Sequence, residues 1–148
     1  MWVYSALVTP GRTGLHDHEL RRSLAANRAA LRRGGRFAFE TRHPQARAWQ
    51  GWNPTNATEV TDPTGRRLRV THHVESVTGD LVTVTETTSQ PDGTILRADR
   101  ATLRFLDLPT LNSFLTEAAF TIDAQYGDWH HEPITNTSRE IITIARRA

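Results

Sequence analysis

The hydrophobic positions of residues 16–33 are spaced as in an amphipathic helix. Leu20, Leu24 and Leu31 recur at the separation that places side chains on one helical face. Asp17 is the predicted N-cap, and the glycines at 34 and 35 supply a left-handed stop behind the last turn. We therefore expect a helix over 16–33 that packs through its leucines.

A second apolar stripe follows Asp107. Pro109 suits the first helical position, because the N–H that proline lacks has no partner there. The stripe predicts a helix with one buried face, which consists of Leu108, Leu111, Phe114, Leu115 and Ala118.

Alternation of apolar and polar residues marks the strands. Pro91-Asp92-Gly93 is a hairpin signal, so the middle strands form an antiparallel meander. Residues 45–66 look irregular, and the apolar stretch from Trp2 to Val8 reads as a short strand or a tail. The predicted strands are 36–41, 68–74, 81–88, 95–105, 120–126 and 139–146.

Composition narrows the classes of protein. A chain of 148 residues makes one domain, or one domain with an appended subdomain. The absence of cysteine excludes a disulfide scaffold and a thiolate nucleophile. All 18 basic residues are arginines, and they are interleaved with 16 acids along the chain, so we expect no nucleic-acid partner. No apolar run reaches membrane-spanning length, and no basic residue precedes the apolar N-terminal stretch, so we expect a cytoplasmic protein without a membrane partner.

Three segments carry a family resemblance. Residues 24–42, which include Leu31-Arg32-Arg33-Gly34-Gly35-Arg36, resemble the helix, L-R-P-G-G-R, strand signature of class I S-adenosylmethionine-dependent methyltransferases, with Arg33 in place of proline. Residues 114–120 resemble the L-x-x-A-G-F segment of that family, with Ala119 in place of glycine. Residues 126–129 with 138–147 resemble its final antiparallel hairpin. The similarity covers roughly residues 17–147.

The resemblance implies an α+β fold that contains the C-terminal part of the Rossmann-like methyltransferase sheet. Strands 36–41, 120–126 and 139–146 would be the last three strands, with the final one antiparallel between the other two. Two helices and an inserted three-stranded antiparallel meander at about 66–106 complete this domain, which spans 16–148, and residues 1–15 form an N-terminal tail or short strand.

The cofactor half of the family pattern is missing. That half needs a strand, a glycine-rich turn and a helix, followed by an acid that holds the ribose hydroxyls. Gly11 and Gly14 are the only early glycine pair, and no such unit surrounds them. The resemblance implies S-adenosylmethionine as cofactor, but we expect no cofactor-binding residues and no donor binding by the isolated chain. The chain would then be a truncated, misannotated or split gene product.

The resemblance also suggests where a small-molecule substrate would bind. In the family, the loop after the fifth strand contacts substrate, and the meander would act as a lid. In this hypothesis Arg42 forms an ion pair with an acidic group of the substrate, while Trp49 and Trp52 line the pocket around an aromatic or cationic acceptor. The alternative is that the two tryptophans only anchor the loop. The candidate substrate-binding residues are Arg42, His43, Trp49, Trp52, Tyr126, Trp129 and His130.

Histidines raise two further hypotheses. A histidine of the 126–131 cluster acts as a general base, or the cluster is a solvated turn with one packed tryptophan. The pairs His16-x-His18, His72-His73 and His130-His131 suggest a metal, but neighbouring strand residues point to opposite faces and no acid has matching spacing. We expect no metal site and assign no catalytic residue.

The leading reading is the substrate-side half of a small-molecule methyltransferase, with class I chemistry if the chain is active. Two alternatives remain: a small-ligand-binding α+β module, and a non-catalytic interaction subunit. Without the earlier strands, strand 36–41 would expose an edge near Phe37 and Phe39. We therefore expect marginal stability, self-association or a partner chain at that edge.

Overall fold

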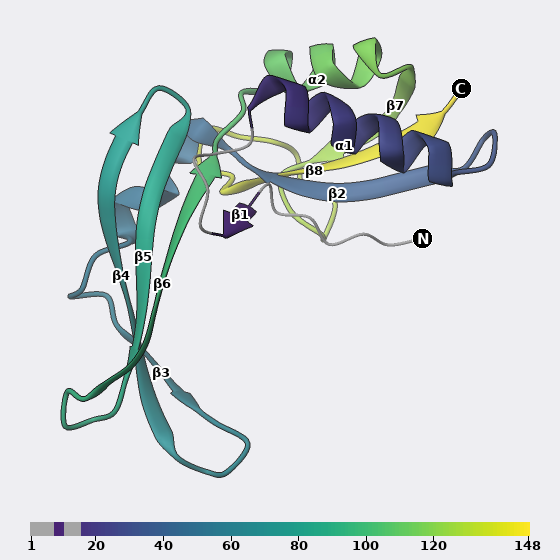
Figure 1. Cartoon of the computed structure of the whole chain (residues 1–148). Coiled ribbons are helices and arrows are strands. Elements are labelled where there is room, and N and C mark those ends of the chain that lie inside the picture. The colour runs from purple at the N-terminus through teal and green to yellow at the C-terminus, as the bar shows by residue number, and fades with distance from the viewer. Residues whose placement is uncertain (1–7, 11–15) are drawn as a thin grey trace. The chain divides into compact units, whose positions relative to one another are not determined.

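A computed structural model describes residues 8–10 and 16–148 (Figure 1). Most of the apolar stretch from Trp2 to Val8 lies outside the described residues. The chain divides into two compact units. The described residues of the first unit are 16–47 and 104–148, and those of the second are 8–10 and 48–103.

The first unit contains a three-stranded sheet. Its strands are β2 (Arg36–Arg42), β7 (Phe120–Tyr126) and β8 (Glu140–Arg147), in the order β2-β8-β7. The central strand β8 runs antiparallel to both neighbours. This arrangement confirms the predicted placement of the last strand between the other two.

Helix α1 spans Asp17–Ala30 and differs from the prediction at both ends. His16 is the N-cap, so Asp17 is already helical, and the carboxylate of Glu19 accepts a hydrogen bond from the His16 N–H at 3.0 Å. The helix ends three residues before the predicted position because Leu31 turns to an extended conformation. The Arg147 side chain donates to the carbonyls of Arg28 and Leu31, which satisfies the free end of the helix.

Helix α2 spans Leu108–Glu117 and begins one residue before Pro109, the predicted first helical position. The Asp107 carboxylate accepts a hydrogen bond from the Thr110 N–H at 2.7 Å. Both helices lie on the same side of the sheet (Figure 1). Their apolar faces and the facing strand residues form a buried core of Leu20, Leu24, Phe37, Phe39, Leu106, Leu111, Phe114, Leu115, Phe120, Ile141 and Ala145.

The second unit is an antiparallel sheet in the order β1-β6-β5-β4-β3. The meander is confirmed as β4 (Arg67–Thr78), β5 (Leu81–Ser89) and β6 (Ile95–Arg104). The described residues add two outer strands, β1 (Val8–Pro10) and β3 (Thr58–Thr61).

The prediction that residues 45–66 are irregular was therefore wrong at β3. Asp62 closes a tight turn by accepting hydrogen bonds from the backbone N–H groups of Thr64 and Arg66, and Gly65 adopts φ +84°. This turn brings Val60 opposite Leu68 on β4. The rest of the segment includes two short 3-10 helices, η1 (Pro44–Ala46) and η2 (Ala48–Gly51).

Neither α-helix in the described ranges has the length and apolar character that a membrane crossing requires.

Candidate substrate site at the strand ends of the first unit

Three strand ends meet at one edge of the first sheet. Strand β2 ends at Arg42, β7 ends at Tyr126 and β8 begins at Glu140, so the antiparallel order brings these ends together. The loop 127–139 connects β7 to β8 at the same edge. The structure thus gathers five predicted residues in or beside this loop: Arg42, His43, Tyr126, Trp129 and His130.

Trp49 and Trp52 belong to the second unit. They lie in η2 and directly after it. The Trp52 ring lies 6.4 Å from the ring of His72 on β4. Their predicted contact with substrate would therefore come from the second unit.

The first half of the connecting loop is organised by Asp128. Its carboxylate accepts hydrogen bonds from the backbone N–H groups of His130 and Glu132, at 2.8 and 3.2 Å. Both hydrogen bonds lower the pKa of Asp128, and the bond from Glu132 has the larger effect. Gly127 leaves no room for a side chain, because a Cβ there would lie 2.5 Å from Ser138 Oγ and 2.8 Å from the Pro133 carbonyl oxygen.

Aromatic residues flank Asp128. The Tyr126 and His131 rings are stacked with centroids 4.4 Å apart. Trp129 donates its indole N–H to Oε2 of Glu40 at 2.9 Å, and 39% of the residue remains exposed. An exposed indole beside a carboxylate can attract a cation through both the ring face and the charge.

Arg42 and His43 differ in their availability. Arg42 pairs with Glu140 at 3.3 Å, so an acidic substrate group would have to compete with that carboxylate. His43 is 5% exposed, and its N–H donates to the Arg139 carbonyl. Burial lowers the pKa of His43, although a hydrogen bond to the Ser138 backbone acts in the opposite direction. His43 is thus a buried residue that supports the loop.

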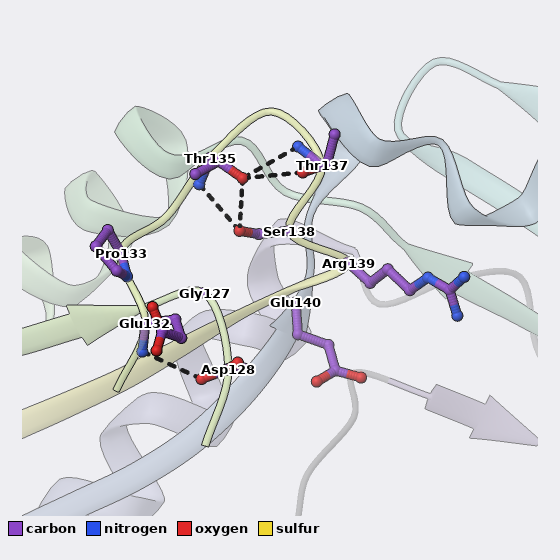
Figure 2. Close-up of a pocket in the computed structure, with 9 residues that line it drawn as sticks. All are labelled: Gly127, Asp128, Glu132, Pro133, Thr135, Thr137, Ser138, Arg139 and Glu140. Carbon is purple, nitrogen blue, oxygen red and sulfur yellow. Dashed lines mark hydrogen bonds between the residues drawn. The ribbon is translucent and has the colours of Figure 1, made fainter. Parts of the chain in front are cut away.

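A cavity of about 490 Å³ opens beside this loop (Figure 2). Thr135 and Ser138 hold its rim, since the Thr135 N–H donates to Ser138 Oγ at 2.9 Å. Sequence reasoning missed this part of the site. The signal in the sequence was the cluster of small polar residues between Pro133 and Arg139, which is typical of a tight turn. The lining residues are Gly127, Asp128, Glu132, Pro133, Thr135, Thr137, Ser138, Arg139 and Glu140.

The described residues do not fit a nucleoside cofactor. A cradle for S-adenosylmethionine needs a glycine-rich turn between a strand and a following helix. In the described ranges, the connection from β6 to α2 is Phe105-Leu106-Asp107 and contains no glycine. The glycines with positive φ in these ranges precede a strand or lie between paired strands, and they are Gly34, Gly65, Gly79 and Gly93. The described histidine and acidic side chains also form no group of three or more that suits a metal ion.

No family model and no curated protein matches this sequence. Solved structures do match. An S-adenosylmethionine-dependent methyltransferase from Clostridium acetobutylicum is 15% identical, with a TM-score of 0.66 over 90% of this chain and 53% of its own. The CcbJ methyltransferase from Streptomyces caelestis is 15% identical, with a TM-score of 0.67 over 99% and 56%. The S-adenosylmethionine-bound amino pentose methyltransferase CalS10 from Micromonospora echinaspora is 18% identical, with a TM-score of 0.58 over 88% and 51%.

At these identities the likeness establishes the fold alone. The chain spans about half the length of the methyltransferases that it matches. It therefore has a partial S-adenosylmethionine-dependent methyltransferase fold, in agreement with the resemblance read from the sequence.

Proposed function

We propose that this chain supplies the substrate-side part of a small-molecule methyltransferase and does not bind S-adenosylmethionine alone. The observation that carries the proposal is the order β2-β8-β7 with β8 antiparallel, within a fold that covers about half the length of the solved methyltransferases that it matches. The donor would be held by a strand, a glycine-rich turn and a helix that lie outside the described residues.

The strand-end edge of the first unit supports a role in acceptor binding. Methyl transfer depends on holding the acceptor in line with the donor, in a pocket from which water is excluded. The loop 127–139 is fixed by Asp128, Gly127 and the bond between Trp129 and Glu40, so its side chains are preorganised. We propose Arg42, Tyr126, Trp129 and His130 as acceptor contacts, with His43 as their buried support.

The charges at this edge favour a cationic acceptor. Glu40, Asp128, Glu132 and Glu140 provide carboxylates, whereas Arg42 and Arg139 provide the guanidinium groups. Arg42 is already paired with Glu140, which leaves an excess of negative charge. One structural neighbour is an amino pentose methyltransferase by its name, and an amine-bearing acceptor is consistent with that name.

We also propose that the domain runs over 16–148 and that its antiparallel insertion, placed at about 66–106 by the sequence, caps the acceptor. Trp49 and Trp52 would then provide an aromatic wall. The long strands β4, β5 and β6 support this role because they lie in a sheet that is distinct from the sheet of β2, β8 and β7.

An NMR titration of the isotope-labelled full chain tests the acceptor proposal. Glucosamine is the cationic probe, and N-acetylglucosamine is its uncharged control. We expect glucosamine alone to shift the Glu40 amide and the Trp129 indole N–H in a saturable way, and Glu40→Gln to weaken binding. Equal shifts with both sugars, or shifts confined to other residues, would contradict the proposal.

A further inference from the structure

The outer edge of β2 has unpaired backbone groups in the described part of the molecule. There, β2 pairs with β8 alone. The His43 N–H donates to Arg139 and the Arg147 N–H donates to Gly35, which fixes the odd-numbered residues of β2 as those bonded to β8. The N–H and C=O groups of Arg36, Ala38 and Glu40 therefore point away from β8.

We propose that two copies of this chain pair antiparallel through this edge, about a two-fold axis at Ala38. Hydrogen-bonded pairs then form between Ala38 and its own copy, and between Arg36 and Glu40 of the other copy. Each such pair exchanges two backbone hydrogen bonds. The two sheets would join into one continuous sheet through β2, and this inference does not depend on the proposed function.

Charge selects this register. With Ala38 at the centre, both cross-strand ionic pairs join Arg36 to Glu40. A centre at Phe39 would place Arg36 opposite Arg42, and a centre at Glu40 would place that carboxylate opposite its own copy. Directly opposed like charges destabilise a strand pair. Charged residues at a sheet edge commonly oppose association. Along β2, however, Arg36 and Glu40 stand at equal distances from Ala38, so two antiparallel copies place opposite charges together.

The side chains allow this pairing. The Arg36 side chain is 67% exposed, and it contacts Asp123 through Nε. Glu40 contacts Trp129 through Oε2. The cross-strand ionic pairs form when Arg36 and Glu40 turn from these partners within their own copy to each other. Phe37 and Phe39 are already buried beneath the helices, so the contact gains little apolar burial and is expected to weaken with salt.

Analytical ultracentrifugation of the full chain, from micromolar to millimolar concentration, tests the register. We expect a dimer for the native sequence. Arg36→Glu and Glu40→Arg should each weaken dimerisation by about tenfold, because each creates two like-charge pairs, and the double variant should restore it. Arg21→Glu with Glu117→Arg is the matched control, since that ion pair joins α1 to α2 away from β2. Circular dichroism melting shows whether each variant folds.

A monomer at all concentrations would overturn the proposal and leave the edge to another kind of partner. A dimer that both single reversals leave intact would overturn it too, because another surface would then hold the copies. A cross-link gives a second measurement. The chain has no cysteine, and hydrogen-bonded partners about 5.5 Å apart suit a disulfide. Ala38→Cys should oxidise to a dimer faster than Ala98→Cys on β6, and equal rates would count against the pairing.

Discussion

Trp129 donates its indole N–H to Oε2 of Glu40 at 2.9 Å, across 89 positions of the sequence. This bond ties the loop after β7 to the end of β2, the two elements that carry most of the candidate substrate residues. It therefore connects the fold of the first unit with its site.

Loss of this bond should loosen the loop. Glu40→Ala removes the acceptor, and a hydrogen bond to a charged group at a half-exposed position stabilises a protein by about 1 kcal/mol. We expect that loss in urea denaturation, together with an upfield shift of the Trp129 indole proton towards its unfolded position. Glu117→Ala is the control, since its partner Arg21 is exposed and the change should be smaller. Equal losses in both variants would show that Glu40 has no special role.

The backbone at position 127 requires glycine. In Gly127→Ala the new Cβ would lie 2.5 Å from Ser138 Oγ, so the loop must shift to admit it. We expect destabilisation of about 1–3 kcal/mol, typical of an overpacked site. Gly51→Ala is the matched control, because nothing lies within 4 Å of a Cβ there. Thermal melts that do not separate the two variants would refute the steric reading.

Helix α2 should depend on its N-cap. Asp107 accepts a hydrogen bond from the Thr110 N–H, and replacing such a cap by alanine destabilises a helix by about 1 kcal/mol. Asp107→Asn keeps an acceptor oxygen and should retain most of the stability. Chemical denaturation of both variants measures the difference, and an asparagine variant as unstable as the alanine variant would argue against capping.

The pH dependence of stability should contain a contribution from His43. Burial lowers the pKa of His43 in the folded chain below its ordinary value of 6.5. The unfolded chain then binds the proton more readily, so this contribution is complete above about pH 6.5 and is lost as pH falls through the lowered folded pKa. His43→Gln should flatten the stability profile on the acid side of that value. A profile of the variant that falls as steeply with acid as that of the native chain would contradict the assignment.

The sequence predicted the elements that depend on local chemistry. The leucine stripe of α1 and the hairpin at Pro91-Asp92-Gly93 each act within a few residues, and each was found. Strand β3 was missed because four exposed residues carry no apolar alternation, although the Asp62–Gly65 turn signals a hairpin. The early end of α1 depends on Arg147, which no local pattern reveals.

The candidate site shows the same limit. The sequence named Trp129 and the residues that follow β2, but the bond between Trp129 and Glu40 joins segments far apart in the chain. The division that assigns Trp49 and Trp52 to the second unit is likewise a property of the folded chain.

Isothermal titration of the full chain with S-adenosylmethionine tests the central claim most directly. Because the described residues contain no strand, glycine-rich turn and helix that suit the donor, the titration should give only heats of dilution. Saturable binding in the micromolar range, with one site per chain, would contradict the account.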